Sequence, residues 1–143
     1  MIKIKKGYIA IYGNNIVLRL DKFLMGGKKE IKASTWPPFI FFQKEEDEIP
    51  WVVNHELIHF RQTFELFFIG ALILDIFERL YARIFLGMSA YEAYHYSSLE
   101  QEAYLNQNNQ EYLKNRKRFN VFNYIKHKKN FSMDKNGLVT LKS

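Results

Sequence analysis

Cysteine is absent from the sequence, and proline and glycine are scarce, with three and seven residues respectively. Without cysteine there are no disulfide bonds and no thiolate ligands, so a metal ion here must be held by nitrogen and oxygen atoms. The absence of disulfides favours a reducing compartment, and no N-terminal stretch has the apolar core of a signal peptide, so we expect a cytoplasmic protein. The apolar run 66–74 is far shorter than the ~18 residues that a membrane-spanning helix needs, which predicts a buried helix instead.

The composition is that of a folded protein. A chain of 143 residues with 48% hydrophobic and 17% aromatic residues suits one domain with a continuous core. The formal charge of +6 permits an anionic partner without requiring one. We interpret the basic residues of 114–118 and 126–129 as a solvated face, and we do not expect nucleic-acid binding, because Gly-rich loops with stacked aromatics are missing. The sequence leaves open a peripheral membrane contact and the oligomeric state.

Strand-forming residues concentrate near the N-terminus. Residues 8–12 and 16–20 flank Gly13-Asn14-Asn15, which predicts a hairpin. Residues 28–33 predict another short strand. Residues 39–42 predict a strand at a sheet edge, because two prolines abut it, and an extended peptide substrate would add to that edge.

Helical patterns dominate the remainder of the chain. A helix is expected from Pro50, a buried helix within 64–87 after a break near Gly70, another from Ser97 or Ser98, and a last one over 111–126. Asp75, Arg79 and Arg83 repeat at four-residue spacing, which indicates a solvated stripe on the second helix; a helix at a membrane interface is the alternative. Residues 131–133 and 138–141 predict a small C-terminal hairpin.

The segment 54–62 contains His55-Glu56-Leu57-Ile58-His59. On an α-helix, residues four apart lie about 40° apart around the axis and roughly 6 Å along it, so His55 and His59 can bind the same metal ion. Glu56 then lies beside the ion, where its carboxylate can take a proton from a metal-bound water molecule and return it to a leaving group. This pattern predicts a zinc site with Glu56 as the general base.

A catalytic zinc site usually has three protein ligands and a water molecule, so a third ligand is needed. The candidates are His95, Glu100 and Glu102. Glu100 and Glu102 are two residues apart, so on a helix they point about 200° apart and cannot both bind one ion. Ala103 shares a face with Glu100 and would let this helix pack closely against the motif helix. That favours Glu100 without excluding Glu102.

Residues 100–104, Glu-Gln-Glu-Ala-Tyr, resemble the Glu-x-x-Ala-Asp element of the gluzincins, a family of zinc metallopeptidases with a His-Glu-x-x-His helix. The resemblance implies a zincin-like fold and Zn²⁺ held by His55, His59 and Glu100, with Glu56 as the base. Tyr104 departs from the pattern, because gluzincins usually have an aspartate there that supports a ligand histidine.

A second resemblance covers residues 39–131. The patterns Asn-His-Glu-x-Ile-His-x-x-Gln, Ser-x-Glu-x-Glu-Ala-Tyr and Tyr-Leu-Lys-x-Arg-Lys are similar to those of a family of small uncharacterised proteins of Bacteroidetes-type bacteria and their phages. This likeness supports the metal site and adds a phage-associated location to the expectations, but it implies no substrate.

These features together predict a single α+β domain over 1–143, small, mostly helical and zincin-like. It would comprise N-terminal strands (1–35), a metallopeptidase-like core (36–131) and a short C-terminal hairpin or tail (132–143). The predicted activity is zinc-dependent hydrolysis of a peptide bond in a peptide or protein. The alternative is a zincin-fold binding or structural module, in a virion or at a membrane, that retains metal without turnover.

An aromatic cluster precedes the ligand helix. Its phenol or imidazole groups are candidates for stabilising the oxyanion of a tetrahedral intermediate, with simple aromatic packing as the alternative. Gln62 lies one turn after His59, where it either hydrogen-bonds within the site or serves helix packing. The candidates in the cluster are Tyr91, Tyr94, His95 and Tyr96.

Overall fold

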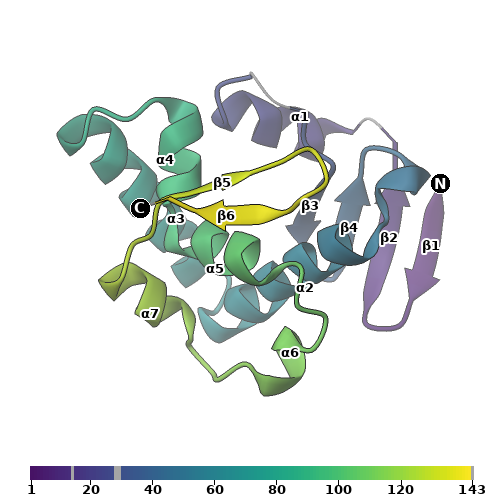
Figure 1. Ribbon diagram of the computed structural model, residues 1–143. Helices are drawn as coiled ribbons and strands as arrows, with labels where there is room; N and C mark the ends of the chain where they lie inside the picture. The colour runs from purple at the N-terminus through teal and green to yellow at the C-terminus, as the bar shows by residue number, and fades with distance from the viewer. Residues whose placement is uncertain (14, 28–29, 143) are drawn as a thin grey trace.

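The computed structural model describes residues 1–13, 15–27 and 30–142, and it confirms a mixed α/β fold with strands at the N-terminus (Figure 1). Residues 28 and 29 of the expected strand 28–33 lie outside the described residues. The strands are β1 (Ile2–Lys5), β2 (Tyr8–Tyr12), β3 (Ala33–Trp36), β4 (Phe39–Phe42), β5 (Phe131–Met133) and β6 (Val139–Leu141). The helices are α1 (Ile16–Leu24), the short 3-10 helix η1 (Glu45–Asp47), α2 (Pro50–Glu65), α3 (Ile69–Phe85), α4 (Ala90–Tyr96), α5 (Ser98–Asn106), α6 (Tyr112–Asn115) and α7 (Val121–Lys126).

The larger sheet has the strand order β1-β2-β4-β3. β1 and β2 form an antiparallel hairpin, β2 and β4 run parallel, and β3 and β4 run antiparallel. The prediction that 39–42 is an edge strand is wrong, because β4 lies between β2 and β3. The two prolines fall in the turn before β4, so they remove no hydrogen bond from the interior of the sheet. β3 is a free edge instead.

The prediction that residues 16–20 form the second strand of a hairpin is also wrong. β2 pairs with β1, and residues 16–24 form the helix α1. The local cause is Asn15, whose side chain accepts a hydrogen bond from the backbone N–H of Leu18 at 3.1 Å and so caps the helix start. The apolar residues of this segment also suit a strand, so their composition alone did not distinguish the two structures.

The helix α2 begins at Pro50, as predicted, and packs across the sheet. Their shared core includes Ala10, Ile40 and Phe42, which are completely buried, together with Val52 from α2. The ring of Phe42 stacks on that of Tyr12 with 5.7 Å between centroids. This packing holds one side of α2 against the sheet.

A sharp corner joins α2 to α3. The break lies at Phe67 and Phe68, which both adopt positive φ angles of 55° and 60°, whereas Gly70 is inside α3 rather than at the break. Among the described residues, no single helix has the length and apolar content to cross a membrane. Only α2 and α3 taken together have enough length and apolar content, and the angle between these two helices is 110°.

The orientation of α3 contradicts the predicted solvated stripe at Asp75 and Arg79, whereas Arg83 is exposed as predicted. Asp75 and Arg79 pair with each other at 2.7 Å on the inward side, and Glu78 is only 6% exposed. The large apolar side chains point outward, with Phe77 67% exposed and Ile84 69% exposed. The expectation of a buried apolar helix is therefore wrong, because α3 packs against the fold mainly through small residues, charged groups and Leu74.

The C-terminal region contains the predicted hairpin but not the predicted long helix. Residues 111–126 form two short helices, because the chain turns between them and sends Arg116 inward. Arg116 and Lys128 each pair with a buried glutamate, so they do not belong to a solvated basic face. β5 and β6 are antiparallel, and in Figure 1 their turn extends toward α1 and β3. At that turn Gly137 has φ +81°, and a Cβ there would clash with the ring of Trp51 at 2.5 Å.

Candidate metal centre

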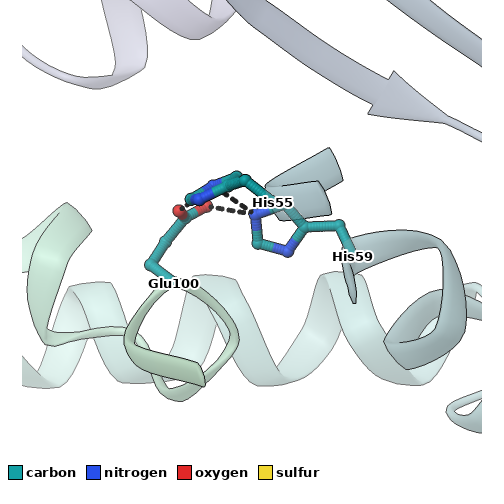
Figure 2. A group of neighbouring side chains, drawn as sticks. All are labelled: His55, His59 and Glu100. Carbon is teal, nitrogen blue, oxygen red and sulfur yellow. Dashed lines mark hydrogen bonds and ion pairs between the residues drawn. The ribbon is translucent and has the colours of Figure 1, made fainter. Parts of the chain in front are cut away.

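The helices α2 and α5 bring three potential ligands together (Figure 2). One ligand atom from each of His55, His59 and Glu100 lies within 4.8 Å of the others. The two Nε2 atoms are 3.1 Å apart, and the Glu100 carboxylate oxygens lie 3.4 Å from that of His55 and 3.3 Å from that of His59. Among the residues that the structure describes, His95 and Glu102 do not belong to such a group. The geometry therefore selects Glu100 from the three candidates for the third ligand.

A glutamine side chain holds each histidine ring from behind. His55 Nδ1 lies 2.9 Å from Gln107 Oε1, and His59 Nδ1 lies 2.8 Å from Gln62 Oε1. Because an amide oxygen only accepts, each Nδ1 carries the proton and donates it. Each Nε2 then faces the point that the three ligand atoms share, where it can bind a metal ion once it carries no proton.

The two amide groups are themselves oriented by buried carbonyl and carboxylate oxygens. Gln62 Nε2 donates to the Leu99 carbonyl at 3.0 Å and to Glu102 at 2.8 Å. Gln107 Nε2 donates to the Gly137 carbonyl at 2.6 Å. With the amide nitrogens engaged in this way, the amide oxygens must face the histidines.

Glu102 supports the centre from outside it. Its side chain is fully buried, and Arg116 binds both of its oxygens, with Nε at 2.6 Å and a terminal nitrogen at 3.2 Å. Tyr112 donates a further hydrogen bond at 2.8 Å, and Arg116 also reaches Glu65 of α2 at 2.7 Å. This network fixes Gln62 and, through it, the ring of His59.

Tyr104 occupies the position where the gluzincin pattern has aspartate. Its ring packs edge-on against His55 with 4.5 Å between centroids, and it makes no hydrogen bond to that ring's Nδ1. Gln107, three residues further along the chain, supplies the acceptor instead. Gln107 was not predicted from the sequence. Its position one helical turn after Tyr104, where the gluzincin aspartate is missing, is the signal that could have identified it.

Charge favours a cation at the shared point. Burial disfavours the ionised form of Glu100, yet the two histidines hold the pKa of its carboxyl well below the ordinary value. Burial likewise opposes the charge on His59, but the Glu100 carboxylate outweighs it and raises the pKa of His59 to about 10. Glu100 Oε2 is buried and accepts no hydrogen bond. In the metal-free protein a proton on His59 compensates this carboxylate, and a metal ion would displace that proton.

Glu56 lies beside the three ligands and is only 6% exposed. It lines the same cavity as His59 and Glu100, and a second cavity beside His55. Thr35 in β3 donates a hydrogen bond to Glu56 Oε2 at 2.6 Å. Thr35 was not identified from the sequence, because the contact depends on the packing of β3 against α2.

A cavity of about 470 Å³ adjoins the centre. It is lined by residues of α1, β3, α2, α3, α4 and α5, and this lining is largely apolar. Of the four aromatic candidates, Tyr94 lines this cavity together with Glu56 and Glu100. The Tyr96 ring instead lies under the ammonium group of Lys128 at 4.3 Å, and the His95 ring stacks on Tyr104.

Two acidic groups also line the cavity. Burial raises the pKa of Asp21 to about 6, opposed by a hydrogen bond from Ser34 and reinforced by Glu56 and Glu100. Burial also raises the pKa of Asp75, against the pull of Arg79. Burial is the largest cause for both groups, and the negative charge of Glu100 adds to it.

No family model matches the chain, and no significant match was found among curated proteins or solved structures.

Proposed function

We propose that the protein is a zinc-dependent metallopeptidase that holds Zn²⁺ at His55, His59 and Glu100. The observation that carries the proposal is the convergence of both Nε2 atoms on the Glu100 carboxylate, while a buried glutamine anchors the opposite nitrogen of each ring. Two imidazoles and one carboxylate are a donor set that suits zinc and leaves a coordination position open for catalysis. The buried, unsatisfied Glu100 oxygen supports the same fit.

A bound zinc ion supplies acidification of a coordinated water molecule and polarisation of a carbonyl group. Glu56 accepts the proton of the attacking water and delivers it to the departing amine nitrogen. The hydrogen bond from Thr35 holds one Glu56 oxygen and leaves the other to exchange the proton. Burial raises the pKa of Tyr94 well above its usual range, so this phenol stays protonated and can donate a hydrogen bond to the oxyanion.

The substrate in this proposal is an extended peptide. β3 has a free edge, and all four of its residues line the cavity beside Glu56. A peptide that pairs with this edge brings a backbone carbonyl past Glu56 and directs alternate side chains into the cavity. The apolar lining, to which Leu24, Met25 and Leu72 contribute, favours an apolar side chain next to the bond that is cleaved.

The test combines metal analysis with peptide cleavage. Wild type and the variant Glu56→Gln should both bind one zinc ion, measured by elemental analysis after dialysis, since all three ligands are intact. A digest of a mixed peptide library should show cleavage by the zinc-loaded wild type and at least about a thousandfold slower cleavage by Glu56→Gln. Glu46→Gln, in the exposed η1 helix, is the matched control and should cleave normally.

Two results would overturn the proposal. Undiminished cleavage by Glu56→Gln would remove the general base from the mechanism. Stoichiometric zinc binding by a wild type that cleaves nothing in the library would support the alternative, a metal-retaining binding or structural module.

A further inference from the structure

The outer surface formed by α1, residues 64–68 and α3 is apolar, and we refer to it as the apolar face. Ile16 and Phe23 of α1 are 78% and 77% exposed, Phe67 at the corner is 82% exposed, and Ile73 and Phe77 of α3 are 61% and 67% exposed. α3 alone is about 25 Å long at the standard rise per residue. So many large apolar side chains exposed on neighbouring segments are unusual on a protein that stays in water and mark a binding surface.

The charged residues of these segments are sorted by sign. All the acidic residues turn inward to partners: Asp21 to Ser34, Glu65 to Arg116, Asp75 to Arg79, and Glu78 to Lys128. The exposed charged residues of α1 and of 61–86 are all basic, namely Arg19, Lys22, Arg61 and Arg83. The exposed charges on the segments that carry the apolar face are therefore all positive.

We propose that the apolar face docks on an anionic lipid surface, with its large side chains among the acyl chains and these basic residues at the headgroups. Apolar insertion combined with basic residues at the rim is how an interfacial protein binds anionic membranes. The two helices lie along such a surface rather than across it, consistent with the absence of a single membrane-spanning helix among the described residues.

A second copy of the chain fits this face less well than lipid does. A twofold contact through the apolar face would bring the basic residues of one copy near those of the other. The exposed surface of α1 and 61–86 offers no carboxylate to neutralise that repulsion. Phosphate groups of anionic lipids supply the missing negative charge.

Several residues of the apolar face also line the cavity beside the metal centre. Leu20 and Leu24 of α1 line it on one side, and Phe68, Ile69 and Leu72 line it on the other, and all five are partly exposed. Docking therefore places these lining residues, and one side of the cavity, at the lipid surface. The docking itself does not depend on the proposed hydrolysis.

The experiment measures binding of the full chain to vesicles by flotation. Wild type should float with vesicles of phosphatidylcholine and phosphatidylglycerol at 3:1, and binding should weaken in pure phosphatidylcholine and in high salt. The triple variant Ile73→Gln, Phe77→Gln, Ile84→Gln should partition at least about tenfold less, because three inserted apolar side chains are lost. Substituting Arg19, Lys22 and Arg83 with glutamine should weaken vesicle binding about fivefold for each charge removed.

The matched control is Ile2→Gln, Ile4→Gln in β1, which removes two apolar side chains that are 67% and 86% exposed but lie on the sheet. This variant should bind vesicles like wild type, and circular dichroism should show that every variant is folded. Failure of wild type to float with anionic vesicles would overturn the proposal. So would an equal loss of binding in the β1 control, or a dimer that the triple variant dissociates while vesicles remain unbound.

Discussion

The two longest helices are neighbours in the sequence, yet they arrange their side chains in opposite ways. α2 buries apolar residues such as Ile58 against the fold and places polar ligands between the sheet and α5. α3 buries Glu78 between small residues and turns Phe77 outward. The polar residues buried in α2 form a site, whereas those in α3 tie the helix to its neighbours and leave the apolar side outside.

This difference shows that hydropathy identifies a helix more readily than it identifies the buried face. The pattern of α3 is as apolar as that of a core helix, and its charges at four-residue spacing look like a solvated stripe. The inward face is decided by partners elsewhere in the chain, such as Lys128 and Ser98, which bind Glu78 at 2.5 and 2.6 Å. Four predictions test the contrast, beginning with the largest expected effect.

Arg116 ties α2 to α5 through Glu65 and Glu102, so removing its charge should destabilise the protein. Arg116→Met leaves Glu102 buried without its counter-ion and also releases Glu65. We expect the free energy of unfolding to fall by about 3–5 kcal/mol in denaturant titrations. The control Lys114→Met removes an exposed ion pair with Glu111 and should change stability by less than about 1 kcal/mol. Equal losses in both variants would show that the buried network does not stabilise α2.

Asp21, the inward acid of α1, should make stability depend on pH. Burial raises the pKa of Asp21 from 3.8 to about 6 in the folded state, so folding favours the protonated form. Its contribution is fully present below about pH 4 and is lost as pH rises toward 6, amounting to about 2–3 kcal/mol.

The variant Asp21→Asn should lack this loss in the metal-free protein. Unfolding curves at pH 4 and pH 7 should therefore differ less for Asp21→Asn than for wild type. Glu46→Gln, at an exposed position, should reproduce the wild-type profile. A wild-type profile in Asp21→Asn would mean that Asp21 ionises normally in the folded protein.

The glutamines behind the histidines should tune metal affinity. Gln107→Leu removes the acceptor for His55 Nδ1 and should weaken zinc binding about 10- to 100-fold in competition with a chelating dye. Gln110→Leu, at an exposed position three residues away, is the control and should bind zinc normally. Unchanged affinity in Gln107→Leu would show that the ring is held by packing against Tyr104 alone.

The smallest expected effect comes from the same substitution made once in α2 and once in α3, which compares the two helices directly. Ile58→Val in α2 deletes a methylene group from a fully buried side chain and should cost about 1 kcal/mol of unfolding free energy. Ile73→Val makes the same change on the outer side of α3, where the side chain is 61% exposed, and should cost less than about 0.5 kcal/mol in buffer without lipid. Similar losses in thermal or denaturant unfolding would mean that the apolar face is covered within the monomer.

The sequence predicted best what depends on a single element. His55, Glu56 and His59 lie on one helix, so helical geometry was enough to bring them to one side. The preference for Glu100 followed from the face that Ala103 shares on α5. Both inferences need only the spacing within an element.

Features that depend on contacts between distant residues were not predicted. Thr35 reaches Glu56 only because β3, rather than β4, forms the sheet edge beside α2. Gln107 reaches His55 from just beyond the end of α5. Residues 16–20 were assigned to a strand because strand and helix preferences overlap there, and the cap at Asn15 decided the outcome.

The metal centre depends on the hairpin turn at Gly137, which is among the last parts of the chain to be synthesised. The Gly137 carbonyl fixes the Gln107 amide, which in turn sets the ring of His55. A nascent chain that has emerged from the ribosome only as far as α7 already contains every proposed ligand, yet it lacks the last carbonyl that orients them. Metal binding is therefore expected to reach full affinity only after β5 and β6 have been translated, and incomplete chains should bind metal more weakly.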